Sequence, residues 1–153
     1  LHFKVHDMRE TCNEKYDAIF NLFTSFGYFE DDADNHKTIK AIHNSLTETG
    51  FAVIDFMNVD YVVENLVADE VKSVDGIDFH IKRYLKDGHI YKEIDFKDKG
   101  EKFHFTEKVQ ALRLEDFEKI MEEAGIYLLD IFGDYKLRKF FKTQSERLIM
   151  IFK

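Results

Sequence analysis

Three turn signals at a constant spacing are the feature that most constrains the fold of this chain. Asp75-Gly76, Asp87-Gly88 and Lys99-Gly100 follow one another every twelve residues, and segments of alternating apolar and polar residues lie between them. Such a pair between two alternating segments is a strong short-range signal for a β-hairpin. Residues 70–112 are therefore expected to form an antiparallel β-meander.

The turns also set the register of the meander, because side chains alternate between the two faces of each strand. One face is predicted to carry six apolar side chains: Phe79, Ile81, Ile94, Phe96, Phe103 and Phe105. An apolar surface of this size is rarely left in water. We expect it to cover a substrate cleft, to pack on the rest of the molecule or to meet a second subunit.

The other face of the meander is predicted to carry two cross-strand rows, one of His80, Asp95 and His104 and one of Tyr84, Tyr91 and Lys108. Two imidazoles and a carboxylate are plausible metal ligands. Cross-strand charge pairing on a solvent-facing surface is far more common. We therefore expect no metal site.

The rest of the chain alternates between strand and helix patterns. Residues 16–23 and 51–57 are nearly continuous apolar runs, typical of strands buried on both faces of a parallel sheet. A helix capped by Asp31 or Asp32 is expected between them, with Ile39, Ile42 and Leu46 on its apolar stripe and a turn ending at Gly50. Further strands are expected at residues 1–5, 126–132 and 147–152, and further helices after Asn58 and along residues 117–124. This order indicates an α/β fold.

Composition narrows the class of protein. The net charge is -8, which argues against nucleic-acid phosphates as the main ligand. Cys12 is the only cysteine, so no internal disulfide or cysteine zinc site can form, and a reducing, cytoplasmic setting is expected. No apolar run approaches the ~20 residues of a membrane span. The absence of proline and of any linker-like stretch indicates one domain.

Three segments together resemble the class I S-adenosylmethionine-dependent methyltransferases. They are VHDMRE (5–10) with YDAIFNLF (16–23) and SFGY (25–28), then GFAVIDF (50–56) with Asn58, and finally LEDF to AG (114–125) with ERLIM (146–150). The resemblance covers the whole chain in order, including a meander found in a subset of the family. It implies an α/β, Rossmann-like methyltransferase sheet, incomplete at its N-terminal side, with an inserted antiparallel β-meander.

The chain departs from the family at the cofactor loop. The glycine-rich loop after the family's first strand has no counterpart here, nor does the acidic residue that ends its second strand, and no Gly-x-Gly occurs. Such glycines and helix N-termini seat the cofactor. Residues 1–153 are therefore interpreted as the carboxy-terminal part of one methyltransferase domain. The resemblance implies that residues 1–5 then lack neighbouring strands and that the strand at residues 16–23 becomes a sheet edge.

The resemblance assigns four residues to S-adenosylmethionine. The Asp7 carboxylate is expected to accept a hydrogen bond from the adenine amino group, and Met8 to offer its backbone N–H to the ring. The backbone of Asn21 and Leu22 is expected to line the methionine portion. Spacing alone favours a turn cap for Asp7, and the alternative for Leu22 is a place in the core.

Five further residues are candidates for the acceptor side: Phe23, Ser25, Tyr28, Asn58 and Tyr61. The first three lie in a loop that forms either a substrate wall or a packed lid. Asn58 and Tyr61 follow the next strand, at the carboxyl edge where α/β sheets bind ligands, although a helix N-cap is the commoner role for Asn58. No catalytic side chain is identified, because methyl transfer depends chiefly on alignment and exclusion of water.

Two functions remain open. The first is methyl transfer from S-adenosylmethionine to a small-molecule acceptor by the complete enzyme, with the fragment alone inactive. The alternative is a non-enzymatic binding or assembly module that pairs through the meander. Both allow a homodimer formed through the meander or through the exposed sheet edge.

Overall fold

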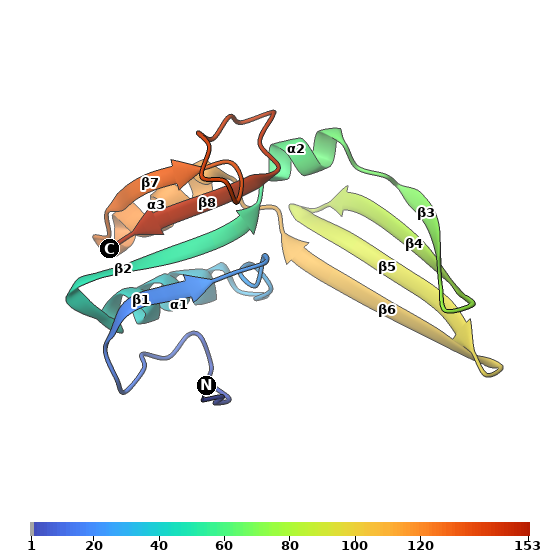
Figure 1. Ribbon diagram of the computed structural model, residues 1–153, viewed down its shortest axis with the longest axis horizontal. Coiled ribbons are helices and arrows are strands. Elements are labelled where there is room, and N and C mark those ends of the chain that lie inside the picture. The colour runs from blue at the N-terminus through green and yellow to red at the C-terminus, as the bar shows by residue number, and fades with distance from the viewer. Residues whose placement is uncertain (1) are drawn as a thin grey trace.

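The computed structural model describes residues 2–153, which form two four-stranded β-sheets and three helices (Figure 1). The main sheet has the strand order β1 (Tyr16–Asn21), β2 (Leu46–Met57), β8 (Arg147–Phe152) and β7 (Leu128–Phe132). β1 and β2 are parallel, whereas β8 is antiparallel to β2 and β7. The predicted α/β class is confirmed, with a mixed rather than a wholly parallel sheet.

Two helices, α1 (Asp32–Asn44) and α3 (Leu114–Ala124), lie together on one face of the main sheet (Figure 1). Asp31 caps α1 by accepting a hydrogen bond from the Ala33 N–H. Gly125 ends α3 in the left-handed conformation that glycine favours. Ile39 and Phe117 are completely buried between these helices and the sheet. The two helices expected in these regions are therefore confirmed.

The opposite face of the main sheet has no helix over it within residues 2–153. Phe20 and Phe51 lie on this face, 57% and 37% exposed, with their ring centroids 6.1 Å apart. β1 is an edge strand of the sheet. The expected edge position is therefore confirmed, but the expected burial of this strand on both faces is wrong, because one side of β1 lacks a covering layer.

The strand expected at residues 1–5 is wrong where the structure can test it. Residues 2–6 have no regular secondary structure, and the Phe3 side chain is 90% exposed. An alternating segment becomes a strand only when a neighbour accepts its hydrogen bonds, and none of the described strands lies beside this one. Leu1 lies outside the described residues. The main sheet therefore has four strands here rather than the five expected.

Two other boundaries differ from expectation. β2 begins at Leu46, so this residue belongs to a strand rather than to the helical stripe, and Gly50 lies inside the strand rather than at its start. A Cβ atom on Gly50 would lie 2.8 Å from the Tyr16 carbonyl oxygen. Glycine is therefore required by the close approach of β1. The second helix, α2 (Val59–Glu64), ends before Leu66.

The second sheet is the predicted meander, formed by β3 (Asp69–Val74), β4 (Ile77–Lys86), β5 (His89–Asp98) and β6 (Glu101–Gln110). The predicted register is confirmed, since Ile94 pairs with both Ile81 and Phe105. The turn residues have the positive φ values of the expected tight hairpins. The meander projects away from the main sheet (Figure 1), and its root joins the common core through Ile90 and Val109.

Candidate functional site

A hollow of about 230 Å³ lies between the segment before β1, β1 itself and α1. Met8 and Asn21, two of the four predicted cofactor residues, line it together. The Asn21 Oδ1 atom is buried and accepts no hydrogen bond from any residue in 2–153. A buried amide oxygen without a donor costs free energy, so it marks a place where a ligand donor would be stabilised.

The other two predicted cofactor residues lie outside this hollow. The Asp7 carboxylate accepts hydrogen bonds from the backbone and side chain of Arg9, at 2.6–3.2 Å. The side-chain and then the backbone hydrogen bonds from Arg9 lower the pKa of Asp7 to about 2. The Asp7 carbonyl also accepts from the Glu10 N–H. These contacts match the turn-forming role that spacing alone favours for Asp7.

Arg9 connects this turn to α1. Its guanidinium lies 2.8 Å from the Asp34 carboxylate and 5.3 Å from the centroid of the Phe29 ring. Leu22 follows β1 and is 37% exposed, so the alternative that placed it in the core is wrong. The structure thus brings Met8 and Asn21 together at the end of β1, with Asp7 and Leu22 adjacent to them in sequence.

The predicted acceptor loop divides into exposed and buried parts. Phe23 is 75% and Tyr28 52% exposed, and Ser25 is also exposed. Phe26, between them in sequence, is completely buried with its ring 5.4 Å from that of Phe117. Partial burial and then the charge of Glu107 on the meander raise the pKa of Tyr28. The loop is therefore anchored by one aromatic side chain and leaves two exposed.

Asn58 does not cap α2 with its side chain. This side chain is buried and donates hydrogen bonds to the carbonyls of Lys142 (2.8 Å) and Ser145 (2.7 Å). The N-cap position favoured from the sequence is therefore confirmed, but the side chain makes no capping hydrogen bond, and its amide binds the β7–β8 loop instead. Tyr61 is half-buried on α2.

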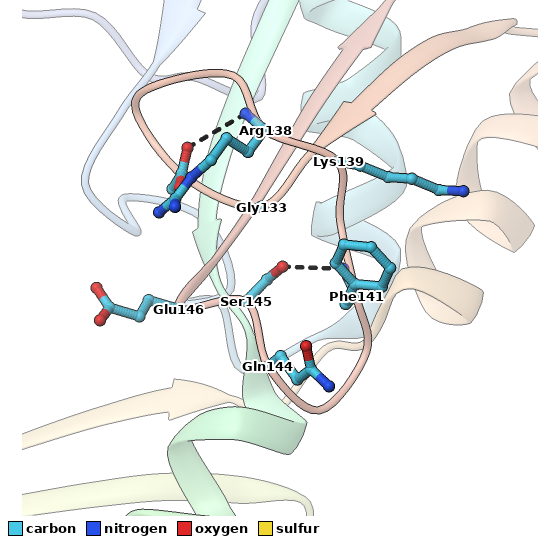
Figure 2. Close-up of a pocket in the computed structure, with 8 residues that line it drawn as sticks. Gly133, Arg138, Lys139, Phe141, Gln144, Ser145 and Glu146 are labelled. Atoms are coloured by element: carbon cyan, nitrogen blue, oxygen red, sulfur yellow. Dashed lines mark hydrogen bonds and ion pairs between the residues drawn. The ribbon is translucent and has the colours of Figure 1, made fainter.

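The β7–β8 loop surrounds a second hollow of about 320 Å³, shown in Figure 2. Ser145 Oγ accepts a hydrogen bond from the Phe141 N–H at 2.9 Å, and Arg138 pairs with Asp134. A Cβ atom on Gly133 would overlap Ser145 Oγ at 2.1 Å. Phe141 with Ser145 and Arg138 with Asp134 are thus paired within the loop, and these contacts fix its shape.

A buried ion pair at the end of β2 was not foreseen from the sequence. Asp55 is 1% exposed, and its Oδ1 atom lies 2.7 Å from both Nε and Nη2 of Arg147. Its Oδ2 atom accepts hydrogen bonds from the Phe23 N–H at 2.8 Å and the Tyr135 hydroxyl at 3.0 Å. Burial of the hydroxyl and its bond to Asp55 raise the pKa of Tyr135. A single acid inside an apolar strand was the signal for this pair, because a buried charge requires a partner.

The row of His80, Asp95 and His104 lies on the face of the meander opposite the six apolar side chains, and its residues are ordinary cross-strand neighbours. Asp95 and His104 are opposite each other and lie 2.8 Å apart. No grouping of three potential metal ligands occurs among residues 2–153. The same residues include no helix that is long and apolar enough to cross a membrane.

Comparisons with known proteins connect this geometry to a class of enzyme. No protein-family model matches the chain. It is 27% identical over 124 residues to a glycine/sarcosine/dimethylglycine N-methyltransferase from Actinopolyspora halophila and 25% identical over 126 residues to a glycine/sarcosine N-methyltransferase from Halorhodospira halochloris. Each match covers 80% of this chain, but only 21% and 45% of the respective relative.

A solved structure agrees with these relatives. An S-adenosylmethionine-dependent methyltransferase from Clostridium acetobutylicum superimposes with a TM-score of 0.84 at 24% identity, over 98% of this chain and 63% of that one. This likeness establishes the fold. The resemblance found in the sequence is therefore confirmed: the chain has a Rossmann-like methyltransferase fold, and its curated relatives are methyltransferases.

Proposed function

We propose that this chain is the carboxy-terminal part of an S-adenosylmethionine-dependent methyltransferase that acts on a small-molecule acceptor in the cytoplasm. The observation that supports this most directly is the unpaired Asn21 Oδ1 in the hollow that it shares with Met8. The hollow runs along the edge of β1, from Cys12 and Ser45 to Asn21 at the carboxyl end of the strand, and α/β sheets bind ligands at that end. The uncovered face of the main sheet supports a longer domain, whose further residues supply the cofactor loop that residues 1–153 lack.

The residues present fit the methionine and adenine portions of this cofactor. Asn21 Oδ1 is a free acceptor, and the ammonium group of S-adenosylmethionine is a donor. The Asp7 carboxylate accepts four hydrogen bonds from Arg9, two on each oxygen, so an adenine amino group would take the place of one of them. When bound, S-adenosylmethionine supplies a methyl group that is already activated by its sulfonium. The chain's own part is to bind, orient and exclude water.

The acceptor that we propose is a small amine. The support is the activity for which the two curated relatives are named, since both are N-methyltransferases. Phe23 and Tyr28, exposed on the loop after β1, are then side chains that line the acceptor site, with Ser25 beside them and Asn58 and Tyr61 supporting the edge from β2 and α2.

Removing the unpaired oxygen tests the cofactor site. The variant Asn21→Leu is expected to bind S-adenosylhomocysteine roughly tenfold or more weakly, because it loses a hydrogen bond to a charged group. Isothermal titration calorimetry on the longer protein measures this. The variant is expected to unfold at the same or a higher temperature, since a buried unpaired polar atom is removed.

The matched control for this prediction is Asn13→Leu, at an exposed position before β1, which is expected to leave the affinity unchanged. Equal affinities of Asn21→Leu and the unchanged protein would remove Asn21 from the site.

The apolar face of the meander supports a second proposal, a homodimer. Rings of Phe79 and Phe103 lie 4.8 and 5.0 Å from that of Phe96, and Phe105 at the edge is 54% exposed. A band of ion pairs, Glu70–Arg83 (2.9 Å) and Lys92–Glu107 (3.1 Å), separates this patch from the root of the meander. The patch is therefore apart from the molecule's own core and available to a second copy.

Light scattering coupled to size-exclusion chromatography tests the homodimer. We expect a dimer for the unchanged protein and a monomer for Phe105→Asp, because a charge in the apolar patch would be desolvated without a partner. Val71→Asp is the control, since Val71 is 58% exposed on the opposite face of the meander and is expected to leave the dimer intact. A monomeric unchanged protein would contradict this proposal.

A further inference from the structure

The turn after β1 is held in an unfavourable backbone conformation. Phe23 and Thr24 have φ values of 60° and 57°, in the left-handed region that residues other than glycine rarely adopt. Thr24 is β-branched, which makes this conformation still less favourable. Such strain persists only where the surrounding structure over-determines it, and it is concentrated at functional sites.

Three hydrogen bonds with Asp55 and Arg147 hold this turn. The Phe23 N–H donates to the Asp55 carboxylate at 2.8 Å, and the Thr24 N–H donates to the Asp55 carbonyl at 3.0 Å. The guanidinium of Arg147 donates to Thr24 Oγ1 at 3.1 Å. Asp55 and Arg147 therefore fix where the chain goes as it leaves β1.

The same carboxylate also holds an aromatic side chain from the β7–β8 loop. Tyr135 donates its hydroxyl to Asp55 at 3.0 Å, and the Arg147 guanidinium lies 5.9 Å from its ring centroid. Tyr135 and Phe23 are nonetheless 62% and 75% exposed. Two exposed aromatic residues from distant parts of the chain are thus tied to one buried carboxylate.

We propose that Asp55 and Arg147 are positioning residues of the acceptor site and that Tyr135, together with Phe23, contacts the acceptor. This inference rests on the proposed methyltransferase function. Asn21 of β1 pairs with Ile54 of β2, and Asp55 is the next residue of β2. Asp55 and the residues bound to it therefore lie at the carboxyl end of these two parallel strands. They adjoin the end of β1, where Asn21 marks the cofactor side.

The test uses the variant Tyr135→Phe of the complete enzyme that we propose. This substitution keeps the aromatic ring and removes only the hydrogen bond to Asp55. The KM for the acceptor, with glycine and sarcosine as probes, is expected to rise about fivefold, the value of one hydrogen bond. The Kd for S-adenosylhomocysteine is expected to be unchanged, and the Tm is expected to fall only slightly, because the folded protein loses one hydrogen bond. Amide hydrogen exchange at Phe23 and Thr24 is expected to become faster, because their shared anchor is loosened.

The control is Tyr127→Phe, an exposed tyrosine before β7, which is expected to change none of these quantities. An acceptor KM equal to that of the unchanged protein, or an equal weakening of acceptor and S-adenosylhomocysteine binding, would overturn the inference. Failure of the proposed methyltransferase function can be told apart from failure of this inference, because the unchanged protein would then methylate neither glycine nor sarcosine.

Discussion

Asp55→Ala is expected to destabilise the chain by about 3–5 kcal/mol, because it leaves the Arg147 guanidinium without its partner in a largely buried position. Asp55 is 1% exposed, and the Arg147 side chain is 20% exposed. The variant also removes the acceptor for the Phe23 N–H and the Tyr135 hydroxyl. Urea unfolding followed by circular dichroism measures the loss.

A second variant separates the lost ion pair from a general loss of packing. Asp55→Leu combined with Arg147→Met replaces both charges by apolar groups, which is often nearly neutral for a buried pair. We expect the double variant to be more stable than Asp55→Leu alone. Additive effects of the two substitutions would show that the pair is not coupled.

Phe117→Ala is expected to cost about 3–5 kcal/mol, because it leaves a cavity at the centre of the core. The Phe117 side chain is completely buried, and its ring lies 5.4 Å from that of Phe26 and 5.3 Å from that of Phe56. These rings belong to three separate segments, so the cavity cannot collapse by moving one element.

Phe141→Ala is the matched control for the core variant. Phe141 is 52% exposed on the β7–β8 loop, and its truncation is expected to cost less than about 1 kcal/mol, since little apolar area leaves a buried site. Equal unfolding free energies for Phe117→Ala and Phe141→Ala would contradict the central position of Phe117 in the core.

The meander was predictable because its determinants are local. Turn chemistry at residues 75–76, 87–88 and 99–100 and a side-chain period of two fix which residues face one another. The confirmed pairing of Ile94 with Ile81 and Phe105 follows from these two rules alone. The helical stripe that includes Phe117 was predictable for the same reason, since its period of 3.6 is contained within one segment.

The edges of the main sheet were less predictable because they depend on distant neighbours. Residues 2–6 alternate like a strand but have no partner among the described strands. The apolar pattern of β1 indicates burial on both faces, whereas Phe20 is largely exposed at a sheet edge. A sequence pattern reports which faces are suited to burial, and whether they are buried depends on which elements are present.

The candidate site was only partly visible in the sequence. Asn21 and Met8 were identified through a family resemblance, and the structure places both in one hollow. Asp55 was passed over because its partners are far away in sequence, Tyr135 by 80 residues and Arg147 by 92. Asn58 was assigned to the nearest helix, although its amide binds a loop more than 80 residues away. Local rules cannot find such long-range partners.

Methyl transfer by the complete enzyme that we propose is the measurement that tests the central claim most directly. S-adenosylmethionine labelled with a trideuterated methyl group is incubated with the protein and either glycine or sarcosine, and the products are analysed by mass spectrometry. We expect one acceptor to gain the labelled methyl group, and the yield to fall in Asn21→Leu but not in Asn13→Leu. Absence of labelled product from the unchanged protein, together with no detectable binding of S-adenosylhomocysteine, would contradict the proposed function.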